Sequence, residues 1–304
     1  MDIIYTSTIL SWALCAALFA AYATSIAKEI TYVTLADGRK TERRIPLVFR
    51  LLLPFVPNLR TLVSRKMFAQ SREAADRMIL SSGLEGLISG EEFIAIKLMM
   101  PFVFGFVWLA AVLGLSSIAP ESIIAENRAM LAVFGFLIGY VYPLAWLRST
   151  LKKRHLEIMR ALPFVLDLLT LSVEAGMDFM SALQRNCATR KLDALNEELI
   201  RMTHEIQVGK PRRVALRNMS ERVRQQDLTS VVNALVQADE LGVSIGSILR
   251  IQSDQLRSRR FDRAEKLANE APVKMLGPLL LCIFPAVFLV LLGPIVSQAA
   301  EGLF

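Results

Sequence analysis

Apolar stretches and charged regions alternate along the chain. Four stretches are almost free of charge, and the last of them carries no charge from Met275 to Val296. Because about 20 apolar residues cross the hydrocarbon core of a bilayer as a helix, each stretch is long enough to span a membrane. The pattern predicts four transmembrane helices, at residues 1–27, 98–119, 129–147 and 273–297.

The last apolar stretch contains interior prolines, which would break a helix in water. In lipid the backbone has little alternative to the helix, so proline kinks a span without abolishing it. Pro278 and Pro285 are seven residues apart and fall on roughly one face of a helix. We therefore interpret this stretch as a kinked final span.

The composition agrees with a membrane protein, since 54% of the residues are hydrophobic and the mean hydropathy is +0.44. The first apolar stretch could also be a cleavable signal peptide. It lacks a basic leader, since Asp2 precedes it, and it is longer than the usual apolar core of about 7–15 residues. We favour a retained anchor and keep the signal peptide as the alternative.

The basic residues predict the orientation of the spans. Lys and Arg cluster after the first and third spans, whereas Arg128 is alone on the opposite side. The positive-inside rule places residues 28–97 and 148–272 in the cytoplasm. The loop 120–128, the tail 298–304 and both termini are then periplasmic. The net charge of +7 comes from basic residues that lie beside the membrane in this topology, where anionic headgroups attract them. We therefore expect no nucleic-acid binding.

The two cytoplasmic regions differ in character. In residues 28–97, apolar runs alternate with arginine and proline, which predicts an interfacial segment on the inner leaflet followed by short helices. Residues 148–272 show apolar positions at helical spacing, punctuated by Gly176, Gly209 and Gly242. Predicted helix N-caps in this region are Asp178, Asp193 and Asp227. The sequence predicts an all-α polytopic membrane protein with four spans and one cytoplasmic bundle of about six helices.

The sequence contains almost no pattern typical of a catalytic site. The letters GVSIG, Gly242 to Gly246, match a nucleophile pattern, but a helix precedes them, and a helix stop followed by a helix start explains them equally. No phosphate-binding loop is present, and two isolated histidines, His155 and His204, do not make a metal site. We predict no catalytic residue, cofactor or metal. The trimmed spans lack ionisable residues, which argues against a transporter or channel subunit.

Two weaker patterns suggest contact sites. Four acidic residues of the bundle are candidates for binding a basic partner, although solvated surface charge is the simpler explanation: Asp167, Glu174, Asp239 and Glu240. Gly135 and Gly139 form a small-xxx-small pair in the third span, which favours close packing with a helix of this chain or of a partner.

The bundle also resembles a known family. The segments LPFVLDLLTLSVEAGMDFMSALQRN, EIQVGKPRRVALRNMSERV and DLTSVVNALVQADELGVSIGSIL are similar, in this order, to the F domain of type II secretion and type IV pilus platform proteins. The continuation RAEKLANEAPVKMLGPLLLCIFPAVFLVLLGP resembles, more narrowly, the end of TadC proteins of tight-adherence (Tad, type IVc) pilus systems. Larger platform relatives carry two F domains, and this chain shows one.

The resemblance implies a non-enzymatic platform in the bacterial inner membrane that couples a cytoplasmic hexameric secretion ATPase to extraction and polymerisation of pilin, in adhesion and biofilm formation. It also implies assembly with a TadB-like companion, with a second copy, or with both. A platform subunit of a type II protein secretion machine is the alternative.

Overall fold

The computed structural model describes residues 31–34, 40–43, 45–118 and 127–301. The predicted first span, most of the predicted loop 120–128 and the end of the chain lie outside the described residues. The chain divides into two compact units, one ending at Leu249 and the other beginning at Arg250, and each is described by itself.

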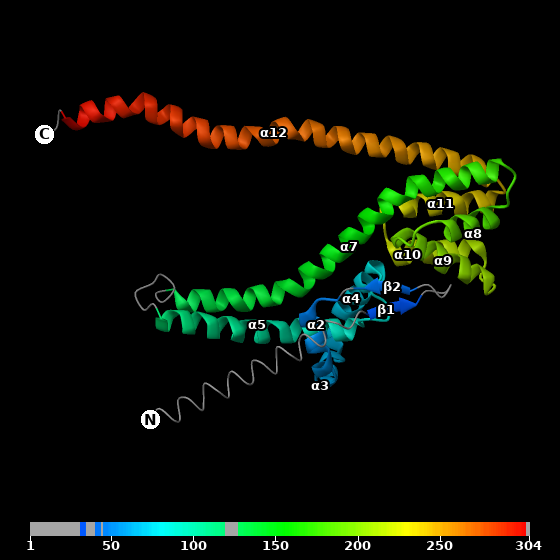
Figure 1. Ribbon diagram of the computed structural model, residues 1–304, viewed down its shortest axis with the longest axis horizontal. Coiled ribbons are helices and arrows are strands. Elements are labelled where there is room, and N and C mark those ends of the chain that lie inside the picture. The colour runs from blue at the N-terminus through cyan, green and yellow to red at the C-terminus, as the bar shows by residue number, and fades with distance from the viewer. Residues whose placement is uncertain (1–30, 35–39, 44, 119–126, 302–304) are drawn as a thin grey trace. The chain divides into compact units, whose positions relative to one another are not determined.

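Helices make up most of the first unit (Figure 1). They are α2 (Leu47–Leu52), α3 (Val56–Val63), α4 (Ala69–Ser82), α5 (Gly90–Ile118), α7 (Arg128–Glu174), α8 (Phe179–Thr189), α9 (Ala194–Gln207), α10 (Arg212–Val223) and α11 (Gln226–Leu241), with the 3-10 turns η1 (Leu53–Phe55) and η2 (Lys66–Phe68). The last helix, α12 (Ile245–Glu301), begins in the first unit and forms most of the second.

A β-hairpin is the one departure from helix among the regular elements described. Strand β1 (Thr31–Thr34) pairs antiparallel with β2 (Lys40–Arg43), with Thr31 opposite Arg43. The all-α prediction is therefore correct for the main architecture and missed this element. Asp37–Gly38, between the two strands in the sequence, is a common hairpin turn signal that could have revealed it.

Three helices in the described residues, α5, α7 and α12, are long and apolar enough to cross a membrane. They extend well beyond the predicted spans. Helix α7 continues from the third apolar stretch to Glu174, so the predicted first bundle helix is its C-terminal part. Residues 148–162 contain no glycine or proline to end the helix, and Pro163 lies inside it.

Helices α5 and α7 lie side by side (Figure 1). Gly135 and Gly139 are buried against α5: a Cβ at Gly139 would lie 2.9 Å from the Cα of Pro101, and one at Gly135 would overlap the ring of Trp108. Trp108 Nε1 donates a hydrogen bond to the carbonyl of Leu131, at 3.0 Å. The small residues thus allow a close approach of two helices within this chain.

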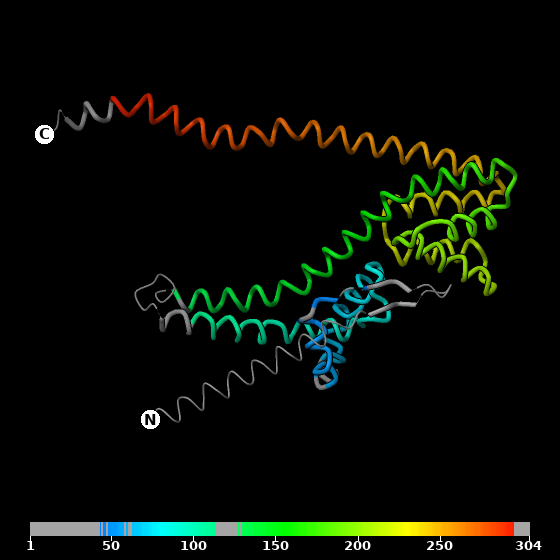
Figure 2. Tube along the Cα trace, in the orientation of Figure 1, coloured from blue at the N-terminus to red at the C-terminus, as the bar shows by residue number. Residues whose placement is uncertain are grey.

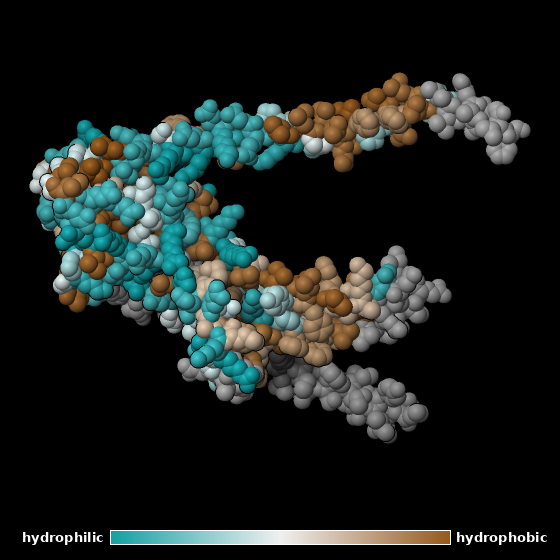
Figure 3. All heavy atoms as spheres, turned by 180° about the vertical axis from the view of Figure 1, so that it is seen from behind, coloured by the Kyte–Doolittle hydropathy of each residue, from teal (hydrophilic) through white to brown (hydrophobic). Residues whose placement is uncertain are grey.

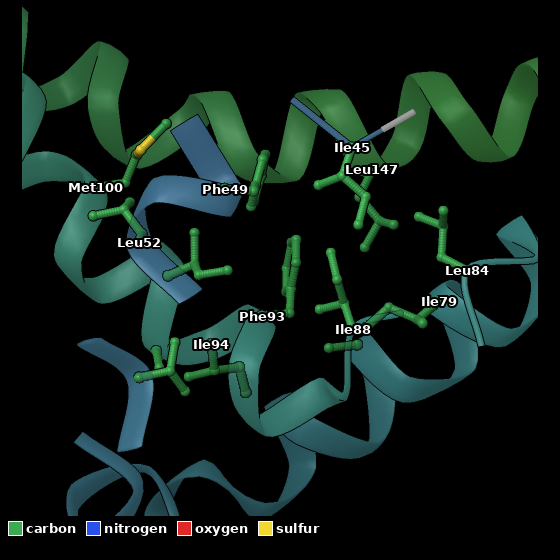
Figure 4. Close-up of a cluster of buried hydrophobic side chains, with 14 of the residues drawn as sticks. Ile45, Phe49, Leu52, Ile79, Leu84, Ile88, Phe93, Ile94, Met100 and Leu147 are labelled. Atoms are coloured by element: carbon green, nitrogen blue, oxygen red, sulfur yellow. The ribbon is translucent and has the colours of Figure 1, made fainter. Parts of the chain in front are cut away.

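An apolar cluster surrounds the point where α5 and α7 leave their apolar stretches (Figure 4). Phe49 of α2 is fully buried, with its ring centroid 4.8 Å from that of Trp146 on α7 and 6.5 Å from that of Phe93 on α5. Helix α4 contributes Ile79 to the same cluster. We call α2, α3, α4 and residues 90–100 of α5 the membrane-proximal module.

Helices α8 to α11 and the C-terminal part of α7 form the bundle. The predicted caps Asp178 and Asp193 are confirmed, because their carboxylates accept hydrogen bonds from Met180 N at 2.9 Å and Asn196 N at 2.7 Å. The predicted cap Asp227 is wrong. Gln225 caps α11 instead, accepting from Leu228 N at 2.6 Å, because the helix begins two residues earlier than expected.

Helix α12 changes character along its length. Its first part is hydrophilic and its second part apolar, as Figure 3 shows. Residues 271–294 are all exposed, and Pro278 and Pro285 lie inside α12, whose tube trace is continuous in Figure 2. An apolar helix exposed on every side suits a lipid environment or a partner span. The role of the two prolines as kinks stays a prediction.

The contact between α5 and α7 leads to a first prediction. Gly139→Leu should lower the free energy of unfolding by about 1–3 kcal/mol, because the new side chain meets the backbone of α5. Thermal unfolding of the detergent-solubilised protein measures the change. Gly277→Leu in α12 is the matched control, since no other part of the described chain lies within 4 Å of its Cβ position. Equal effects of the two substitutions would contradict the packing argument.

Candidate functional site: a buried charge network

Arg154 of α7 is a cation buried inside the protein, with a side chain only 5% exposed. Its Nη1 donates a hydrogen bond to Glu197 Oε2 at 2.8 Å, and its Nη2 donates to Glu198 Oε1 at 3.0 Å. Glu197 and Glu198 are consecutive residues of α9 and are themselves buried. One guanidinium therefore binds two carboxylates from the facing helix.

The network extends from these carboxylates to α10. Arg222 donates from Nε to Glu198 at 3.2 Å and from Nη1 to Glu205 at 2.6 Å. Glu205 also accepts hydrogen bonds from Lys210 Nζ and Asn218 Nδ2, both at 3.0 Å. At the other end of the network, Arg43 of β2 pairs with Glu197.

Charges of opposite sign alternate through this network, and the alternation decides its stability. Moving a charge out of water costs several kcal/mol, and a buried pair offsets this only when geometry and hydrogen bonding are good. Each of the two bridging arginines, Arg154 and Arg222, lies between two carboxylates. Loss of one cation would leave two carboxylates, at least one of them buried, without their shared partner, so the network holds as a unit.

The same network joins the bundle to the membrane-proximal module. Gly83, which ends α4, has φ of +73° and leaves no room for a Cβ, because the Arg154 guanidinium lies against it. Glu85, in the turn that follows, pairs with Arg201 of α9. His155 adds a link inside the bundle, since its Nε2 hydrogen-bonds the carbonyl of Val223 at 2.8 Å.

The electrostatics of the network favour its charged form. Burial alone would raise the pKa of Glu205, but hydrogen bonds from Asn218 and Lys210 and the charge of Arg222 outweigh it and lower the pKa. At the other end, burial lowers the pKa of Arg43, and the charge of Glu197 opposes that shift. An arginine remains charged after such a shift.

The acidic residues predicted as partner contacts lie outside this network. Asp239 pairs with Arg212 and lies 3.8 Å from Arg213, and Glu240 pairs with Arg217 at 2.9 Å. Both therefore meet basic residues of α10 in their own chain.

The other two predicted contact residues are on α7. Asp167 is half-buried, and Glu174 is exposed at the end of the helix. The structure does not bring them into the network, and a role for any of the four in partner binding stays a prediction.

Sequence reasoning missed the network, although a signal was present. Glu198 lies three residues after Leu195 and four before Met202, within an apolar stripe, and Arg222 follows Met219 by three. A charge on a buried helical face is unusual unless it is paired.

The chemistry of this site is ionic. Within the described ranges, no group of three His, Cys, Asp or Glu side chains is arranged to hold a metal. What the network does is fix α7, α9, α10 and the turn after α4 to one another.

The part of the chain that matches a known family is the bundle together with its continuation into the apolar part of α12. Residues 165–293 match the type II secretion system (T2SS) protein F family. The match covers less than half of the chain and includes Glu197, Glu198 and Arg222, whereas Arg154 lies before it. This domain occurs in inner-membrane platform proteins of secretion and pilus systems, which are structural components and not enzymes. No curated protein and no solved structure matches the chain significantly.

The T2SS F match does not distinguish the TadC family from other platform proteins. It supports the resemblance inferred from the sequence at the level of the domain.

The network predicts an unequal effect for two similar substitutions. Arg154→Met should cost about 3–5 kcal/mol of stability, because Glu197 and Glu198 stay buried without their shared cation. Arg217→Met removes an exposed pair with Glu240 and should cost at most about 1 kcal/mol. Denaturant or thermal unfolding in detergent compares the two. Similar losses for both would show that the buried pairs contribute no more than a surface pair.

The lowered pKa of Glu205 predicts that the stability of the protein depends on pH in a defined direction. Its folded pKa lies below the unfolded value of about 4.3, so its stabilising contribution is complete above that pH and is lost as pH falls through the folded pKa. At about pH 6, Glu205→Gln should be less stable than the wild type by about 1–3 kcal/mol. The difference should shrink as the pH is lowered below about 4.

Unfolding of the wild type and of Glu205→Gln, measured across this pH range, tests whether the difference in stability shrinks at low pH. Glu221→Gln is the matched control, because Glu221 is an exposed residue of α10 and its substitution should change stability by less than about 0.5 kcal/mol. A difference for Glu205→Gln that stays constant with pH would contradict the assigned charge state.

Proposed function

We propose that this chain is the inner-membrane platform of a Tad (type IVc) pilus system. In this role it transmits the motion of a cytoplasmic secretion ATPase to the membrane, where pilin subunits are extracted and polymerised. The domain match supports a platform role, and the resemblance of the chain's end to TadC proteins supports the choice of system.

One observation carries the proposal. The bundle, most of which lies within the segment that matches the T2SS F domain, is joined by unbroken helices to a membrane-spanning stretch before it and to another after it. Helix α7 runs from the third apolar stretch into the bundle, and α12 runs from the bundle into the last one. A stiff helix transmits displacement along its length, so a force on the bundle reaches two spans.

The charge network gives this transmission a physical basis. It ties α9 and α10 to α7, and it ties α9 to the turn after α4 through Glu85. A bundle held in this way moves as one body with the membrane-proximal module. In the proposed topology the bundle is cytoplasmic, where a hexameric ATPase reaches it, and both termini are periplasmic. A TadB-like companion, a second copy, or both would complete the platform.

A second function has one observation in its favour. The matched family takes its name from type II secretion, and the same arrangement would serve a platform subunit that exports folded proteins. The single F domain and the TadC-like ending favour the pilus system over this alternative.

Deletion of the gene tests the proposal. The expected result is loss of surface fibres with processed pilin retained in the inner membrane, seen by electron microscopy and by fractionation with an antibody to pilin. Complementation with the wild-type gene should restore the fibres. Unchanged fibres would overturn the pilus assignment. Loss of secreted proteins from the medium, with fibres intact, would favour type II secretion.

A further inference from the structure

The chain between the hairpin and α4 lies beside the ends of two membrane-spanning stretches. We call residues 45–68, which contain α2, η1, α3 and η2, the interfacial segment. In Figure 4 Phe49 lies against the part of α7 that carries Leu147, and Leu52 lies beside Met100 of α5. The segment is thus packed where α5 and α7 change from apolar to charged surface.

Several side chains near this end of α5 and α7 are of the types found at the level of the lipid headgroups. Large apolar residues of α5 are exposed from Phe102 onward, and the Lys97 ammonium lies 4.7 Å from the ring centroid of Tyr140 on α7. Arg148 follows on α7 and is exposed. Aromatic and basic residues at the end of an apolar helix are typical of the membrane interface.

The far end of the interfacial segment leads into α4, which is held to the N-terminal end of α5. Just after it, Arg72 of α4 donates to Glu91 of α5 at 2.8 Å. Glu91 precedes Lys97 by six residues, which is about 9 Å along a helix. Interfacial helices bury their apolar face about 5–10 Å into the boundary between headgroups and acyl chains, so the point where α4 meets α5 lies within about that distance of Lys97.

The segment exposes both of the residue types that bind such a layer. Phe55 is 54% exposed and Met67 is 82% exposed, although each is a large apolar side chain. Arg65 and Lys66, directly before Met67, are also exposed. Apolar side chains enter the acyl boundary, and each basic residue near an anionic bilayer surface adds attraction.

We propose that the interfacial segment binds anionic phospholipids on the side of the membrane from which the bundle emerges. Phe55 and Met67 enter the boundary between headgroups and acyl chains, and Arg65 and Lys66 bind the headgroup phosphates. The anionic bilayer surface is favoured as occupant because its apolar and charged layers lie at the level where the segment exposes these two kinds of side chain. The proposal does not depend on the pilus function.

Lipid binding at this segment would anchor the module that contacts the charge network. The apolar cluster joins the segment to α4, and α4 ends at Gly83 against the guanidinium of Arg154. A bilayer contact would therefore hold one side of the network in place while the bundle bears force.

Nitroxide labels on the full chain test the proposal. Phe55→Cys, Met67→Cys and, as a control at the end of the bundle, Val243→Cys are each made in a background carrying Cys15→Ala, Cys187→Ala and Cys282→Ala. The labelled proteins are placed in nanodiscs of phosphatidylcholine alone or mixed with phosphatidylglycerol. Electron paramagnetic resonance then compares collisions with oxygen, which enters lipid, and with a water-soluble nickel chelate.

The ratio of oxygen to chelate accessibility should be severalfold higher at positions 55 and 67 than at position 243, and it should rise further with phosphatidylglycerol. Arg65→Gln with Lys66→Gln should abolish that rise. Arg185→Gln with Lys191→Gln removes the same charge from an exposed part of the bundle and should leave the rise unchanged.

Ratios at positions 55 and 67 equal to that at position 243 in both lipid mixtures would overturn the proposal and would leave the segment open to a protein partner. Insertion that does not respond to phosphatidylglycerol or to the Arg65 and Lys66 substitutions would overturn headgroup binding. Circular dichroism and the value at position 243 check that each variant is folded. Because only the purified chain and lipid are present, a failure here is separate from any failure of the pilus assignment.

Discussion

A buried positive charge has to be surrounded by negative ones, and in this protein that requirement falls on Arg154. Its guanidinium contacts two carboxylates of α9 and the backbone turn at Gly83, so residues far apart in the sequence must come together for the charge to be buried. Apolar packing tolerates small displacements, whereas hydrogen bonds to a buried ion weaken steeply with distance and angle. The network therefore determines the arrangement of the bundle and the membrane-proximal module more strictly than apolar contact would.

The remaining architecture follows from two kinds of contact around this centre. Near the membrane, Phe49 and its aromatic neighbours fill the space between α2, α5 and α7. Within the apolar stretches, Gly135 and Gly139 bring α7 against α5, since neither carries a side chain that would separate the helices. Both contacts act on α7, which passes through the apolar stretch, the module and the bundle without interruption.

Local signals in the sequence predicted local structure well. Asp178 and Asp193 cap the helices expected of them, and Gly242 ends α11 with φ of +68°. These features depend on a few neighbouring residues, so the sequence alone contains the relevant information. The apolar stretches likewise predicted helices, since the three that fall within the described residues lie in helices long and apolar enough to cross a membrane.

Features that depend on distant partners were harder to predict. The sequence places Glu198 and Arg222 among apolar positions of their helices, but only the fold shows that they face each other. Asp227 failed as a cap because α11 begins at Gln226, so the side-chain oxygen of Gln225 accepts the hydrogen bond from Leu228 N and Asp227 lies inside the first turn. The continuity of α7 through Pro163 was missed because proline usually marks the start or the end of a helix.

The unbroken helix between Leu147 and Arg154 also sets a rotational phase. These residues are seven positions apart, close to two full turns, so both lie on nearly the same side of α7. Leu147 belongs to the apolar cluster of the module, and Arg154 to the charge network. One residue inserted between them would rotate one contact relative to the other by about 100°. The seven-residue spacing thus fixes the angle around α7 between the membrane-proximal contact and the bundle contact.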